Sequence, residues 1–116
     1  MIKFASGKQL ISPKAKERLL YFRQSSFALL HRHFSADWGV VPDAQRVELQ
    51  KHLQEGFGSL VSIFLIEGEA IFYYTVADRS LTFICVPDEV SRLLAPEVTG
   101  GFEELPLIVP ITVPTH

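Results

Sequence analysis

Two short polar signatures hold the side chains of this chain that could do chemistry. The first reads HFSADWG over residues 33–39, and the second reads TVADRS over residues 75–80. Imidazole, carboxylate, hydroxyl and guanidinium groups are those used in acid–base and nucleophilic catalysis. The residues concerned are His33, Asp37, Trp38, Gly39, Thr75, Asp78, Arg79 and Ser80. Catalysis would also require a base that holds a nucleophile in place, so the elements around the signatures decide their role.

The first signature allows two interpretations. In one, Trp38 stacks on a base or a peptide while Asp37 accepts a hydrogen bond from the ligand. In the other, Trp38 anchors a link between two helices in the core, Asp37 binds backbone N–H groups and Gly39 supplies an unusual φ. We favour the second, because these residue types serve more often as corners than as sites.

The second signature lies between two strand-like segments. Asp78 is expected to close the turn, and Arg79 to pair with a nearby acid. A small hydrolytic site at the tip, using Asp78, Arg79 and Ser80, is a weaker alternative, because a two-residue tip seldom gives a nucleophile and its base the required rigidity.

Neither a metal nor a cofactor is expected. His31 and His33 are two residues apart, so on a helix their side chains point about 200° away from each other. His52 lies on the next predicted helix, and no cysteine-rich or HExxH pattern accompanies these histidines. Cys85, between two apolar strand residues, is interpreted as a small core residue.

The charges divide unevenly along the chain. Residues 1–54 carry nine lysines and arginines against four acids, whereas residues 55–116 carry two against nine. A basic face on the helices of residues 13–34 would suit nucleic acid, and this is the main functional alternative. Its contact residues would be Lys14, Lys16, Arg18, Arg23 and Arg32. A pI near 6.0 argues against a dedicated DNA-binding protein.

The pattern of apolar residues changes from a helical to a strand period near Gly56. Short strands are expected at residues 2–4 and 9–11, and helices at 13–23, 26–35 and 42–54. Residues 60–66, 70–76 and 81–86 then form three strands with short turns, which predicts an antiparallel β-meander. The fold class is therefore α+β, with two or three N-terminal helices on a sheet of three or four strands.

The predicted strands are apolar on both faces, so a cover is needed on each. The helices would cover one face, and the C-terminal segment or a second subunit the other. Residues 1–94 are assigned to one domain, and residues 95–116 to a proline-rich arm or edge strand. One helical turn or two is expected over residues 88–94.

The two signatures, with the Gly56-Phe57-Gly58 breaker between them, resemble a family of small uncharacterised bacterial proteins of plasmids and other mobile genetic elements. The resemblance spans residues 4–90 and implies a genomic context but no chemistry. Val76 stands where the family commonly has glutamate, and Ala36 where glycine is usual, so any activity of that glutamate would be missing here.

The sequence therefore predicts a non-enzymatic accessory protein that acts by protein–protein binding. The expected partner is a second copy, giving a homodimer, or an unidentified protein. With one cysteine, no signal-like N-terminus and no apolar run long enough for a membrane span, the chain is expected to be cytoplasmic and not membrane-bound.

Overall fold

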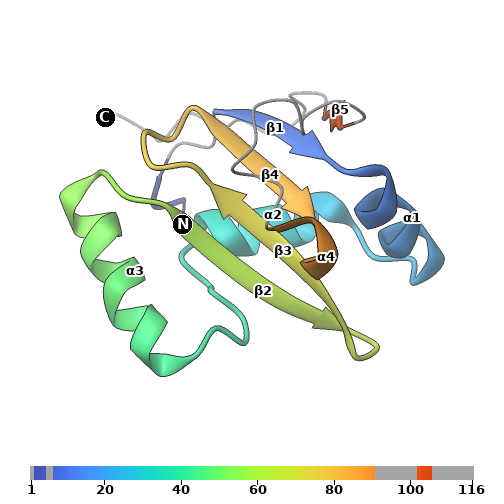
Figure 1. The fold of residues 1–116 in the computed structure, drawn as a ribbon, viewed down its shortest axis with the longest axis horizontal. Coiled ribbons are helices and arrows are strands. Elements are labelled where there is room, and N and C mark those ends of the chain that lie inside the picture. Colours follow the sequence, from blue (N-terminus) through green and yellow to red (C-terminus); the bar gives the residue numbers. More distant parts are fainter. Residues whose placement is uncertain (1, 5–6, 91–101, 106–116) are drawn as a thin grey trace.

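The computed structural model describes residues 2–4, 7–90 and 102–105, which form four helices and five strands (Figure 1). In chain order they are β1 (Lys8–Ile11), α1 (Pro13–Tyr21), α2 (Ser26–Phe34), α3 (Asp43–Glu55), β2 (Leu60–Ile66), β3 (Glu69–Thr75), β4 (Leu81–Cys85), α4 (Pro87–Val90) and β5 (Glu103–Glu104). The α+β class expected from the sequence is confirmed.

Local signals set the helix ends. The Ser12 hydroxyl caps α1 by accepting from the Ala15 amide at 3.1 Å, and Pro13 occupies the first turn, where its missing N–H costs no hydrogen bond. Ser25 caps α2 in the same way. Helix α3 ends at Gly56, whose φ of +73° is the left-handed conformation that favours glycine. These ends lie within two residues of the predicted ones.

The five strands form one sheet in the order β2-β3-β4-β1-β5. Strands β2, β3 and β4 make the predicted antiparallel meander, while β1 pairs with β4 in parallel and β5 pairs with β1 antiparallel. The strand expected at residues 2–4 is absent. There the Lys3 amide donates to the Phe34 carbonyl at 2.6 Å, so this segment is bound to the end of α2 and not to the sheet.

One face of the sheet forms the main core. Helices α1 and α2 pack on it, and α2 crosses behind the strands in Figure 1. The central side chains of this face, Leu60, Ile71, Tyr73 and Ile84, are fully buried. We call this the helical face.

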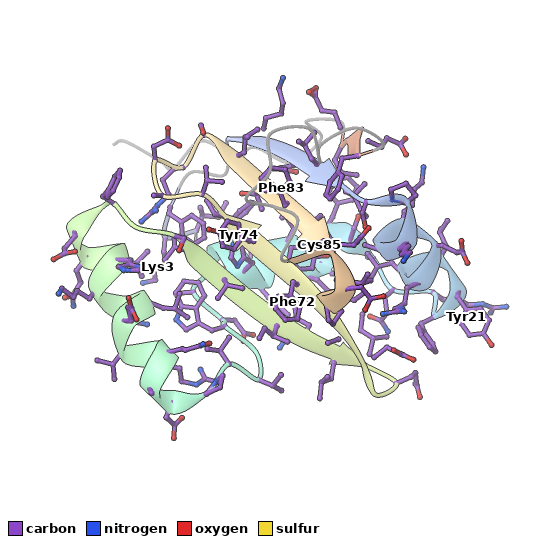
Figure 2. The ribbon with its side chains drawn as sticks, viewed as in Figure 1. Lys3, Tyr21, Phe72, Tyr74, Phe83 and Cys85 are labelled. Atoms are coloured by element: carbon purple, nitrogen blue, oxygen red, sulfur yellow. The ribbon has the colours of Figure 1, made fainter. Side chains whose placement is uncertain are left out.

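The opposite face, which we call the open face, is turned toward the viewer. Figure 2 shows Phe72, Tyr74, Phe83 and Cys85 there, on β3 and β4. Phe83 and Cys85 are buried, and Phe102 packs edge-on against Phe83 with ring centroids 5.6 Å apart. Part of the C-terminal segment therefore covers part of this face. The rest of the predicted arm, and residues 91–94 of the predicted helical turns, lie outside the described residues. Within the described residues, the helices are too short or too polar to cross a membrane.

Candidate functional site

His33 stands at the centre of a buried chain of polar groups that joins the two signatures. Its Nδ1 lies 2.5 Å from the Ser62 hydroxyl and its Nε2 lies 2.9 Å from the Thr75 hydroxyl. Thr75 in turn lies 2.8 Å from the Thr82 hydroxyl, and Ser62 donates to the Asp37 carbonyl at 3.0 Å. This imidazole thus connects α2, the three strands of the meander and residues 37–39, which we call the DWG corner.

The proton positions in this chain follow from counting donors. Because Ser62 uses its only proton on the Asp37 carbonyl, it accepts from His33, so Nδ1 carries the imidazole proton. Nε2 must then accept from Thr75, and Thr75 accepts from Thr82. The arrangement requires a neutral ring, and burial lowers the pKa of His33 from 6.5 to about 3.

A serine beside a histidine is also the first pair of a hydrolytic triad. Here His33 and Ser62 are both completely buried, and the second ring nitrogen meets the hydroxyl of Thr75 where a triad has a carboxylate. Every proton of the chain is already donated within the core. The arrangement therefore positions core elements and offers no reacting atom to a substrate.

The DWG corner is bound to the outer edge of β2. The Asp37 carboxylate accepts from the Gly39 amide at 3.1 Å, and a hydrogen bond from Arg32, with the help of that amide, holds the pKa of Asp37 below its usual value. The Ile63 amide donates to the Trp38 carbonyl at 3.0 Å, and the Val40 amide donates to the Ile63 carbonyl at 2.8 Å. This short bridge protects part of an edge strand that would otherwise be open to pairing.

Trp38 is a core anchor. Only 2 % of its surface is exposed, and its indole stacks near Phe4 and meets the His33 ring edge-on. Its Nε1 has no hydrogen-bond partner among the described residues. Because a buried indole N–H without a partner lowers stability, the apolar contacts of the ring hold Trp38 in place.

The TVADRS turn fastens the meander to α3. The Asp78 carboxylate accepts from the Ser80 amide at 2.9 Å, as expected for a turn, and hydrogen bonds from Ser80 lower the pKa of Asp78. Contrary to the prediction, Arg79 forms no ion pair with an acid among the described residues. Its guanidinium donates to the carbonyls of Gly58, Ala77 and His52, because the turn lies beside the last turn of α3 and the loop that follows this helix. The negative end of the α3 dipole also favours a cation there.

Replacing Arg79 with lysine should therefore lower the free energy of unfolding by about 1–2 kcal/mol, because one ammonium cannot reach carbonyls on three segments at once. Urea unfolding followed by Trp38 fluorescence would measure the change. The matched control is Arg23→Lys, since Arg23 also has a positive φ but is exposed and forms no ion pair among the described residues. Equal effects of the two substitutions would contradict this role of Arg79.

Most cations proposed for nucleic-acid contact are already paired. Lys14 lies 3.9 Å from Asp88, Lys16 lies 2.7 Å from Glu103, Arg18 lies 3.6 Å from Glu69 and Arg32 lies 2.7 Å from Asp37. Arg23 alone of the five has no such pair in the described part of the chain. The basic first half and the acidic second half thus partly neutralise each other at the surface, which weakens the field available to attract a polyanion.

Sequence reasoning missed several members of the buried chain. Ser62 and Thr82 were not singled out, although each is a hydroxyl residue within an otherwise apolar strand, and that interruption was the available signal. It also missed Glu89, which is 8 % exposed and accepts from the Ser12 hydroxyl at 2.6 Å and from the Val86 amide at 3.1 Å. The structure brings His33, Asp37, Trp38 and Thr75 together, and leaves Asp78 and Ser80 at the surface.

Comparison with known proteins adds no assignment. The chain matches no family model and no curated protein, and no solved structure matches it.

Proposed function

We propose that this protein is a non-enzymatic accessory protein that acts by binding, and that it self-associates through the open face of its sheet. The observation that carries the proposal is an apolar patch on β2, β3 and the start of β4. Its residues are Val61, Ile63, Leu65, Phe72, Tyr74 and Leu81. Five of them are half-buried, and 56 % of Leu65 is exposed.

The chemistry of the patch suits a second copy of the same chain. None of its residues is charged, so two identical patches can meet without the repulsion that opposes contact between like charges. Apolar sheet faces stack about 10 Å apart and bury both surfaces at once. The patch has six residues, whereas a standard interface contains about 20–30 residues per partner, so we expect micromolar affinity.

Sedimentation velocity of the full chain across 1–100 µM tests the proposal: we expect a monomer–dimer equilibrium within this range, where about 8 kcal/mol of association energy corresponds to 1 µM. The substitution Leu65→Asp should shift the equilibrium to the monomer, because a carboxylate at the interface loses its hydration. A protein that stays monomeric at every concentration would refute self-association.

Val47→Asp provides the matched control. Val47 is 74 % exposed on α3, so it changes an apolar residue to the same acid without touching the patch. We expect its dimerisation to equal that of the unchanged chain. If both substitutions abolish the dimer equally, the open face is not the interface.

We also propose a role in a mobile genetic element, because the two signatures resemble those of a protein family found on such elements. It predicts that the gene lies among genes of a plasmid, an integrative element or a phage-like island. Inspection of the neighbouring genes tests this point independently of the oligomeric state.

A further inference from the structure

Strand β2 lies at the edge of the sheet, and its outer side is covered in part (Figure 1). The Ile63 amide donates to the Trp38 carbonyl, and the Ile63 carbonyl accepts from the Val40 amide. Gly39 thereby lies beside Ile63 as in a parallel strand. Because alternate strand residues direct their backbone groups to the same side, the N–H and C=O of Leu65 also point outward. Neither group has a backbone hydrogen bond to a helix or loop among the described residues.

A cleft of about 480 Å³ follows this free part of the edge. Its volume falls within the range of ligand sites, about 300–1,000 Å³. The lining contains residues 63–67, from β2 and the turn after it, together with Gly39 and Val40. The four steps of extended chain from residue 63 to residue 67 span about 13 Å. The cleft therefore runs along the strand and begins where the bridge to Gly39 ends.

Three charged side chains line the cleft, and two of them compensate each other. Nε of Arg32 donates to the Asp37 carboxylate at 2.7 Å, and the guanidinium lies over the Phe64 ring, 4.5 Å from its centroid. Glu67, at the end away from the DWG corner, is exposed and forms no ion pair among the described residues. The cleft therefore favours a ligand that brings a positive charge to Glu67.

We propose that the free edge of β2 binds an extended, basic segment of another protein, which pairs its backbone with Leu65 and places a lysine or arginine beside Glu67. In such strand addition, main-chain hydrogen bonds give affinity and side-chain contacts give specificity. The chain itself shows what the edge accepts, because the bridge to Gly39 is a one-residue example of the same contact. Backbone atoms at the edge make this contact, whereas self-association was assigned to side chains of the open face, so the proposal goes beyond the proposed function.

A second copy of β2 fits the edge less well than a basic segment. In an antiparallel pair centred on Leu65, the Glu67 of the copy would lie opposite Ile63. That position is already taken, because Ile63 is bonded to Trp38 and Val40. The copy would also bring a carboxylate to a cleft whose uncompensated charge is negative. The occupant is therefore assigned to a different protein.

Hydrogen exchange of single amides in the full chain, followed by NMR, tests the proposal. Without a ligand, the Leu65 amide should exchange rapidly and the Phe64 amide, which faces β3, slowly. The probe is the hexapeptide acetyl-TVKVTV-amide, whose residues favour an extended chain around one lysine. For so short a contact we expect a dissociation constant of about 0.1 mM, so a probe concentration of about 1 mM should slow exchange at Leu65 about tenfold. An unchanged exchange rate at Leu65 would overturn the proposal.

Two controls identify the contact and its occupant. The same hexapeptide with its four central amides N-methylated lacks those donors and should leave Leu65 exchange fast. If this peptide slows the exchange equally, the contact is not strand pairing. If the Leu65 amide becomes protected without peptide as the protein concentration rises, the occupant is a second copy and the assignment to another protein is wrong.

Charge reversal at Glu67 tests the preference for a basic segment. Glu67→Lys should weaken binding of the lysine probe about threefold, because it replaces an attraction at the surface with a repulsion. Glu55→Lys is the matched control: it makes the same change of charge at an exposed position on α3 that does not line the cleft. If the two substitutions weaken binding equally, net charge alone attracts the probe and the role of Glu67 is refuted. Sedimentation without peptide reports dimerisation separately, so either proposal can fail alone.

Discussion

Gly39→Ala should lower the free energy of unfolding by about 3 kcal/mol or more, one of the two largest effects that we expect. Gly39 has a φ of +69°, and a Cβ there would lie 2.0 Å from the Ile63 carbonyl oxygen. That oxygen accepts from Val40 and belongs to a central residue of β2, so relief of the clash requires release of the DWG corner from the edge strand. Urea unfolding followed by Trp38 fluorescence measures the loss.

Gly56→Ala separates the clash from the backbone strain. Gly56 has nearly the same φ, +73°, but a Cβ there would meet nothing within 4 Å. Gly56→Ala should therefore lower the free energy of unfolding by about 1 kcal/mol, which is the strain of a left-handed alanine alone. If Gly39→Ala proves as mild as Gly56→Ala, the bridge between the DWG corner and β2 contributes nothing to stability.

Acid should destabilise the protein through His33, and this is the second large effect. In the unfolded chain the ring takes up a proton near its ordinary pKa of 6.5, while in the folded chain it stays neutral down to about 3. Below pH 6.5 the unfolded state therefore binds one more proton, so the free energy of unfolding falls by up to about 1.4 kcal/mol per pH unit. From pH 6.5 to 4.5 the loss is about 2–3 kcal/mol.

His33→Gln should remove this slope, because an amide does not titrate in that range. It should also lower the stability at pH 7 by about 2 kcal/mol, since a glutamine side chain cannot bond both Ser62 and Thr75 in the geometry of the ring. His31→Gln, at an exposed position two residues away, should keep the slope. The lowered pKa values of Asp37 and Asp78 mean that their contributions are lost only below about pH 4, outside the measured window. If the free energy of unfolding of the unchanged protein does not change between pH 6.5 and 4.5, a neutral, buried His33 is refuted.

The strongest sequence signals for individual helices and strands are local, and the structure confirms them. The caps Ser12 and Ser25, the breaker at Gly56 and the meander of β2, β3 and β4 depend on a few adjacent residues, so the sequence shows them directly. Two apolar sheet faces also follow from the sequence, because consecutive strand residues point to opposite sides and the residues of both sets are mostly apolar.

The pairing of β1 with β4 depends on long-range contacts. In the sequence, α1, α2, α3 and two other strands lie between β1 and β4. The local pattern of residues 8–11 does not indicate which strand they pair with. The same limit applies to the error at Arg79. Pairing with a nearby acid was expected from the turn alone, whereas the fold brings the His52 carbonyl of α3 and the Gly58 carbonyl of the next loop beside the guanidinium.

The sequence by itself determined the α+β class, the helix ends, the meander and the turn at Asp78, because period, caps and turn residues act over a few positions. Only the tertiary structure decided the role of His33. Ser62, Thr75 and the Asp37 carbonyl come from three separate segments, and burial of all of them at once makes the imidazole neutral and fixes its proton. Pairing, burial and pKa depend on which distant groups meet, and that information exists only once the chain has folded.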